Sequence, residues 1–191
     1  MSNDPSGMTR VGTICACCGE SLKGGFGRRQ FLKLAGSAGL LAAAFPFAAR
    51  GAKRDCQAML LSCIDPRFPE PTLDYMKGRD MLGEYSQFTI AGAAIGVVAP
   101  AFADWSKAFW DNLAASIELH RIKKVIALDH RDCGAARIAY GGASVSTPQR
   151  EAETHRAALM QFRAEANKRH PELAVETGLM GLGGNVEAFA G

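Results

Sequence analysis

The sequence predicts an α/β protein with a central, mostly parallel β-sheet of about four strands flanked by helices. Short apolar runs that end at proline, glycine or charged residues are typical of buried strands. Between these runs, apolar residues recur at the spacing of amphipathic helices. Strands that alternate with helices favour a parallel sheet covered on its faces. The composition agrees, since 48% hydrophobic and 21% charged residues allow a packed core and exclude wholesale disorder.

The first half of this pattern contains two strands and a helix. The apolar run 57–64 stops at Asp65-Pro66, which predicts a short buried strand. A short helix is expected over 71–77, with proline in its first turn. The β-branched and aromatic run 85–91, followed by Gly92, predicts the second strand.

The second half begins with an amphipathic helix, whose apolar stripe is Phe102, Trp105, Phe109, Leu113, Ile117 and His120. The run 124–129 predicts the third strand. Thr147-Pro148 resembles a helix N-cap with proline at the first helical position. The stripe of the helix that follows is Ala152, Leu159, Phe162 and Ala166. A fourth strand is expected over 173–182, interrupted at Gly178.

Residues 1–51 are predicted to be an N-terminal leader, and 52–191 the catalytic domain. Arg28-Arg29 precedes Phe31-Leu32-Lys33 and an apolar run over 34–49, which at about 16 residues is shorter than a spanning helix. This arrangement resembles a twin-arginine export signal, although glycine replaces the usual serine or threonine before the arginines. We therefore expect the export machinery as a partner and the bacterial periplasm as the location. A buried N-terminal helix and an uncleaved membrane anchor are the alternatives.

The leader also contains the cysteines Cys15, Cys17 and Cys18, whose role as metal ligands or as redox-sensitive thiols is open. The whole chain has a net charge of +3, and residues 1–51 carry six basic and two acidic residues. The remainder of the chain therefore has a net charge of −1, close to neutral. A near-neutral body argues against nucleic-acid binding.

Residues able to perform chemistry follow the first and third predicted strands. Ligand sites in such sheets lie beyond the carboxyl ends of the strands. Cys63, His130 and Cys133 offer two thiols and an imidazole there, the ligand set of an open catalytic zinc site. The fourth position would be free for water, whose pKa falls to about 7 on zinc. Taken singly, each cysteine could instead be a small buried apolar residue, and His130 could be a hydrogen-bonded loop histidine without a metal.

Asp65 and Arg67 lie close to Cys63 in the sequence. A carboxylate two residues from a ligand can occupy the open metal position. An arginine two residues further on can hold that carboxylate by paired charge-assisted hydrogen bonds. The alternative is an exposed loop ion pair of little energetic value.

These residues form the motifs Cys63-x-Asp65-x-Arg67 and His130-x-x-Cys133-Gly134, which resemble the signature of the beta-class carbonic anhydrases. The resemblance spans roughly 57–188. It implies one Zn²⁺ per chain on Cys63, His130 and Cys133, with Asp65 and Arg67 as the active-site dyad. The implied reaction is reversible hydration of carbon dioxide to bicarbonate and a proton by a zinc-bound hydroxide. It also implies a homodimer or higher homo-oligomer with the cleft near the dimer interface.

The sequence departs from the family pattern at two places. Thr89-Ile90 replaces an Arg-Asn pair that is frequent before Ala91-Gly92-Ala93, and Asp129 replaces the glycine that commonly precedes the metal histidine. Asp129 either tunes a metal ligand or is a solvated turn residue, and we expect the second.

Two other functions use the same residues. Carbonyl sulfide and carbon disulfide hydrolases resemble the same family, and pocket shape would separate them from a carbonic anhydrase. The other alternative is a non-catalytic exported zinc-binding protein, or a module with a disulfide among Cys56, Cys63 and Cys133.

The remaining conspicuous residues are not expected to take part in the chemistry. The histidines His120, His155 and His170 are expected to be hydrogen-bonded or exposed. Trp105 and Trp110 are expected in the core or at an interface, and Cys56 is expected to be a spare thiol.

Overall fold

The computed structural model describes residues 55–189, so the predicted leader, with its paired arginines and three cysteines, lies outside the described residues. The sheet has the strand order β2-β1-β3-β4-β5. The first four strands are parallel, and β5 is antiparallel to β4. The predicted α/β architecture is therefore confirmed. The strand bounds are β1 (Ala58–Ser62), β2 (Tyr85–Thr89), β3 (Lys124–His130), β4 (Ala174–Met180) and β5 (Val186–Ala188).

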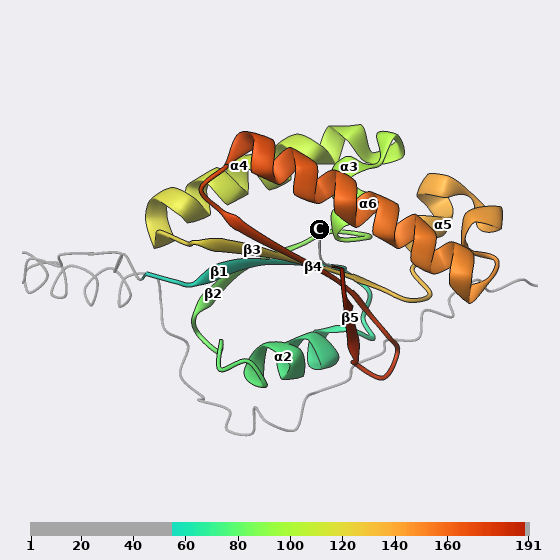
Figure 1. Ribbon diagram of the computed structural model, residues 1–191, viewed down its shortest axis with the longest axis horizontal. Helices are drawn as coiled ribbons and strands as arrows, with labels where there is room; N and C mark the ends of the chain where they lie inside the picture. Colours follow the sequence, from blue (N-terminus) through green and yellow to red (C-terminus); the bar gives the residue numbers. More distant parts are fainter. Residues whose placement is uncertain (1–54, 190–191) are drawn as a thin grey trace, which may run out of the picture. The chain divides into compact units, whose positions relative to one another are not determined.

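Helices cover both faces of the sheet (Figure 1). One face carries α2 (Pro69–Lys77), and the other carries α3 (Ala94–Val98), α4 (Ala103–His120), α5 (Gly134–Tyr140) and α6 (Pro148–Arg169). Two short 3-10 turns, η1 (Pro100–Phe102) and η2 (Gly142–Val145), precede α4 and α6. Within 55–189 no helix is both long enough and apolar enough to cross a bilayer.

The central strand β1 is buried along its whole length, as expected for a parallel strand with both faces covered. Its side chains alternate between two cores. Met59 and Leu61 join the core under α4 and α6, and Leu60 faces the smaller core under α2. The larger core is organised by aromatic rings, among which Phe109 and Phe162 lie 5.4 Å apart between ring centroids. Burial of such a ring contributes about 1.5–3 kcal/mol.

Chain order and sheet order together define where a site can form. The connection from β1 to β2 carries α2 on one face, whereas the connection from β2 to β3 crosses to the other side of β1 with α3 and α4 on the opposite face. The helices therefore diverge between β1 and β3. A crevice forms beyond the carboxyl ends of two such strands.

Several sequence-based boundaries hold, and others change. Thr147 is the N-cap of α6, where its hydroxyl accepts a hydrogen bond from the Arg150 N–H at 3.2 Å. The helix expected over 71–77 begins at Pro69 instead. Gly178 does not interrupt β4. A side chain there would meet Val186 Cγ1 at 2.6 Å, so the glycine lets β5 pack closely against β4.

The short elements α3, α5 and β5 were not predicted, because three to seven residues are too few to show a period. The predicted helix stripe that starts at Phe102 also divides in two, since Phe102 ends the turn η1 and α4 begins at Ala103.

Candidate metal centre

The three predicted ligands converge at the crevice between β1 and β3. Cys63 directly follows β1, His130 is the last residue of β3, and Cys133 is the N-cap residue of α5. Their ligand atoms all lie within 4.8 Å of one another. His130 and Cys133 are buried, and Cys63 is partly buried. This is the only group of three or more such side chains within 55–189 that could hold a metal ion.

The histidine is oriented as a metal ligand. Its Nδ1 lies 2.8 Å from the Arg131 carbonyl oxygen, which fixes the proton on that nitrogen because a carbonyl can only accept. The other nitrogen, Nε2, then carries a lone pair. It is buried and has no hydrogen-bond partner among the described residues. A buried nitrogen without a partner is costly unless something else binds it, so the donor set fits a zinc ion with bonds of about 2.0–2.3 Å.

The two thiols lie in contrasting protonation environments. The Cys133 thiol donates to the Cys63 sulfur, as does the Gly92 N–H at 3.2 Å, and these donors lower the pKa of Cys63 to about 4. The same hydrogen bond, together with burial, raises the pKa of Cys133. The hydrogen bonds therefore favour the thiolate of Cys63, the form that binds metals.

Gly92 supplies its N–H from the turn between β2 and α3. Its φ is +79°, and a Cβ there would lie 2.9 Å from the Ala135 Cβ on α5. Only glycine combines this backbone conformation with such a close approach. The Ala-Gly-Ala segment noted in the sequence thus has a structural role at the site.

Asp65 and Arg67 form the pair that the sequence predicts. Arg67 Nη2 donates to Asp65 Oδ2 at 2.7 Å, and Arg67 Nε donates to Asp65 Oδ1 at 2.9 Å. The Arg67 backbone N–H adds a third bond to Oδ1 at 3.0 Å. These bonds hold the pKa of Asp65 well below its usual range, so the side chain is a carboxylate that only accepts hydrogen bonds.

A second carboxylate, Asp132, also holds Arg67 and was missed by sequence reasoning. Arg67 Nη1 donates to Asp132 Oδ2 at 2.7 Å, and Arg67 Nη2 donates to the Asp132 carbonyl oxygen at 3.0 Å. The only available signal was the position of Asp132 between the two ligands of the second motif.

The interpretation of Asp129 as a solvated turn residue was wrong. Asp129 is the penultimate residue of β3, and its side chain and that of His155 are completely buried. Asp129 Oδ1 accepts the Ala94 N–H at 2.9 Å, and Oδ2 lies 2.8 Å from His155 Nδ1. Burial raises the pKa of Asp129, and the hydrogen bond to His155 opposes that rise. The β-strand continues through this residue and carries it under α3 and α6, which the local sequence could not reveal.

Apolar side chains surround the ligands. Phe68 stacks on the His130 ring with 3.9 Å between ring centroids, which shields the imidazole from the α2 side. A pocket of about 340 Å³ opens beside Cys63 and Asp65, with walls formed by Ile64, Ala91, Phe102, Trp105, Ala135 and Ile138.

The other conspicuous residues have structural positions. Trp110 is buried in the larger core, whereas Trp105 is partly exposed and stacks on Phe102 at the pocket. His170 caps α6 and lies 3.5 Å from Glu172. No disulfide joins the cysteines within 55–189.

Comparison with solved structures defines the class of fold. The beta-carbonic anhydrase of Coccomyxa, in complex with acetazolamide, matches with a TM-score of 0.50 and 15% identity, over 83% of this chain and 84% of that chain. A tetrameric beta-carbonic anhydrase of Sordaria macrospora matches with a TM-score of 0.48 and 15% identity, over 85% of this chain and 96% of that chain. The chain has the mixed α/β fold of the Coccomyxa enzyme.

Sequence comparison identifies closer relatives. The uncharacterized protein RC0076 of Rickettsia conorii is 33% identical over 133 residues, which cover 70% of this chain and 72% of that protein. An uncharacterized protein of Rickettsia bellii is 32% identical over 133 residues, which cover 70% of this chain and 81% of that protein. The chain belongs to the family of these Rickettsia proteins. No protein-family model matches it.

Proposed function

We propose that this protein is a zinc-dependent carbonic anhydrase, which reversibly hydrates carbon dioxide to bicarbonate and a proton. One observation carries the proposal. Two cysteine sulfurs and His130 Nε2, which has no hydrogen-bond partner within 55–189, meet at the switch point of the sheet, directly beside a carboxylate that an arginine holds. The fold shared with the Coccomyxa beta-carbonic anhydrase is consistent with it.

Each residue has a distinct task in this proposal. Cys63, His130 and Cys133 would hold the zinc ion. Cys133 would release its proton on binding, and the two thiolates would then neutralise the charge of the metal. The bound metal supplies a Lewis acid that lowers the pKa of water to about 7. Asp65 is kept away from the ligand position because Arg67 donates three hydrogen bonds to its two oxygens. One lone pair of Oδ2 is left to accept a hydrogen bond from the reacting water.

The pocket beside the site suits a small apolar substrate. Ile64, Trp105 and Ile138 give it apolar walls, and it opens directly at Cys63 and Asp65. Carbon dioxide carries no net charge and needs no ion pair to bind, which matches such walls. Carbonyl sulfide shares these properties, so the assay must compare the two substrates.

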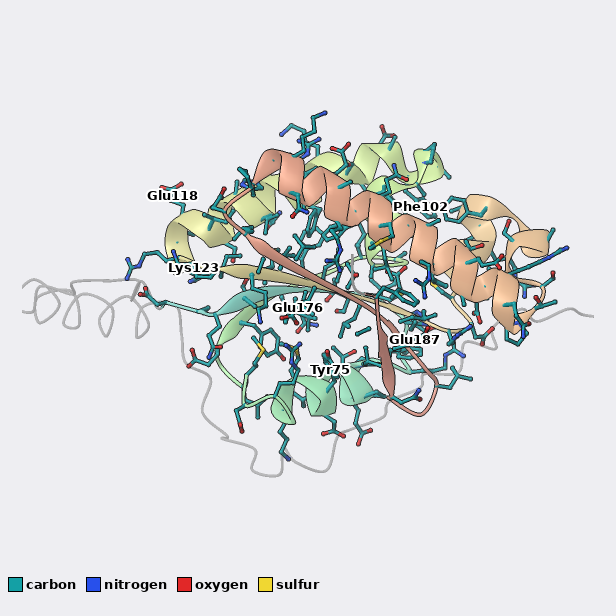
Figure 2. The ribbon with its side chains drawn as sticks, in the orientation of Figure 1. Tyr75, Phe102, Glu118, Lys123, Glu176 and Glu187 are labelled. Atoms are coloured by element: carbon teal, nitrogen blue, oxygen red, sulfur yellow. The ribbon has the colours of Figure 1, made fainter. Side chains whose placement is uncertain are left out.

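Replacing Arg67 by alanine is expected to lower kcat/KM for carbon dioxide hydration by about 10- to 100-fold, the usual effect of losing a residue that orients a metal-site group. Freed from Arg67, Asp65 can move onto the metal. Stopped-flow hydration measured on the zinc-quantified full chain tests this expectation. Arg79→Ala is the matched control, because Arg79 pairs with Glu176 at 2.7 Å on the α2 side of the sheet, where Glu176 and Tyr75 are seen in Figure 2.

Full hydration activity in Arg67→Ala would remove the assigned role of the dyad. A zinc-loaded wild-type chain that hydrolyses carbonyl sulfide but does not hydrate carbon dioxide would replace the proposed substrate. A zinc-loaded chain inactive on both would overturn the enzymatic function.

We also propose that the chain assembles as a homodimer or a higher homo-oligomer. Ile138 is 73% exposed and Ile64 is 61% exposed, and both lie at the rim of the pocket together with Trp105. Large apolar side chains grouped at one place on a surface are typical of an interaction site. Sedimentation equilibrium tests this, and a monomer at micromolar concentration would contradict it.

Export by the twin-arginine route remains a proposal from the sequence alone. The paired arginines before a short apolar run support it. Changing Arg28 and Arg29 to lysine should leave the chain in the cytoplasm, as measured by cell fractionation. Unchanged export of that variant would contradict the proposal.

A further inference from the structure

The Asp65–Arg67 pair depends on an anchor that is itself exposed. The Arg67 side chain is 46% exposed and that of Asp132 is 65% exposed. Ion pairs between exposed side chains contribute only about 0–1 kcal/mol, because water screens them and ordering the side chains costs entropy. Arg67 therefore needs an anchor whose backbone is already fixed.

Asp132 has an unusual backbone conformation for an anchor. Its φ is +57°, in the left-handed region that residues with a Cβ seldom adopt. Such a conformation persists only where neighbouring groups hold it. In this conformation, Asp132 directs both its carboxylate and its carbonyl oxygen to Arg67.

Glu151 supplies the group that holds Asp132. Glu151 lies in the first turn of α6, and its Oε1 accepts the Asp132 backbone N–H at 2.5 Å. Its other oxygen, Oε2, accepts from Arg131 Nη1 at 3.3 Å. The Glu151 side chain is only 13% exposed, and its bond to Arg131 is partly buried.

Arg131 links the same loop to α6 and to β5. Its Nη1 donates to the Pro148 carbonyl oxygen at 2.7 Å, and its Nη2 lies 3.6 Å from Glu187 on β5, which Figure 2 labels. Its backbone N–H donates to the Met180 carbonyl oxygen at 2.8 Å. The loop after β3 is thus tied to α6 and to the far edge of the sheet through Arg131 and Glu151.

We propose that Glu151 is a positioning residue for the Asp65–Arg67 pair and acts through the backbone of Asp132. Loss of Glu151 releases the left-handed conformation of Asp132, Arg67 loses its anchor, and Asp65 is free to approach the metal ligands. The inference rests on the proposed function for the importance of Asp65, but the position of Asp65 can be observed without catalysis.

The test compares three variants of the full chain: Glu151→Ala, Glu151→Gln and Glu153→Ala. Glutamine keeps an oxygen that accepts the Asp132 N–H, whereas alanine removes it. Glu153 is an exposed acidic residue on the same helix and serves as the control. Each variant is loaded with cobalt(II), whose visible absorption responds to a change of ligand. Carbon dioxide hydration by the zinc forms is measured in parallel, and thermal unfolding checks that each variant is folded.

Glu151→Ala should give the cobalt spectrum of Arg67→Ala and lower kcat/KM by about 10- to 100-fold. Glu151→Gln and Glu153→Ala should keep the wild-type spectrum and stay within a few-fold of wild-type kcat/KM. In the Arg67→Ala background, Glu151→Ala should cause no further change, because both act on one chain of contacts.

A wild-type spectrum in folded Glu151→Ala overturns the proposal, as does equal loss in the glutamine variant or an additive effect in the double variant. If Glu151→Ala does not fold, Glu151→Leu takes its place, because leucine keeps a side chain of similar size but has no oxygen to accept the Asp132 N–H. An inactive wild-type chain would refute the proposed function, whereas the cobalt spectra would still decide the role of Glu151.

Discussion

Replacing Cys63 by serine is expected to abolish stoichiometric zinc binding. The wild-type full chain should carry about one zinc ion, bound by two thiolates and one imidazole. Cys63 has the lowered thiol pKa and receives the Gly92 N–H, so it provides the preformed negative charge of the site. A neutral hydroxyl at this position supplies neither the charge nor the soft donor. We expect a loss of affinity greater than the 10- to 100-fold seen when an outer partner of a ligand is removed.

Elemental analysis of the purified full chain measures this directly. Cys56→Ser is the matched control, because Cys56 lies seven residues earlier, before β1, and outside the ligand cluster. Its zinc content should equal that of the wild type. Unchanged zinc in Cys63→Ser would exclude this cysteine as a ligand and with it the proposed metal centre.

Replacing Asp129 by alanine is expected to lower the free energy of unfolding by about 2–6 kcal/mol, since each of two buried groups left without its hydrogen-bond acceptor costs about 1–3 kcal/mol. The substitution leaves the Ala94 N–H and His155 Nδ1 buried without their acceptor. It also removes the link between β3 and the start of α3, just after the turn whose Gly92 N–H reaches Cys63. Urea unfolding followed by circular dichroism measures the change.

Two comparisons show whether the cost comes from the pair. In Asp129→Ala/His155→Ala, the loss should be smaller than the sum of the two single losses, because each single change removes the same contact. Asp111→Ala removes an exposed carboxylate that pairs with Lys107 on α4, and should change stability by about 0.5 kcal/mol or less. A loss that small in Asp129→Ala would refute the buried-pair interpretation.

The convergence of the three candidate ligands could be predicted because it follows from strand polarity. Cys63 and His130 each stand where an apolar run ends, and parallel neighbours end at one edge of the sheet. The Asp65–Arg67 pair could also be predicted from the sequence. The two residues lie within one short loop, and side chains two residues apart there can contact each other.

Contacts between distant segments could not be predicted in this way. The pairing of Asp129 with His155 joins β3 to a helix 26 residues later, and the bond from Asp132 to Glu151 spans 19 residues. A local window around Asp129 contains Asp, His and Arg, which is also the composition of a solvated turn. Only the packing of α6 over the end of β3 makes that carboxylate a buried group.

Amino-acid order was therefore enough to place the parallel strands and the three candidate ligands that converge at their ends, because the period of an apolar run and the direction of a strand are local properties. The tertiary structure decided which groups support these side chains. Gly92 donates to Cys63, His155 pairs with Asp129, and Glu151 accepts the Asp132 N–H. Burial and hydrogen-bond partners depend on what packs across from a residue, and that is settled only when α3, α5 and α6 close over the strand ends.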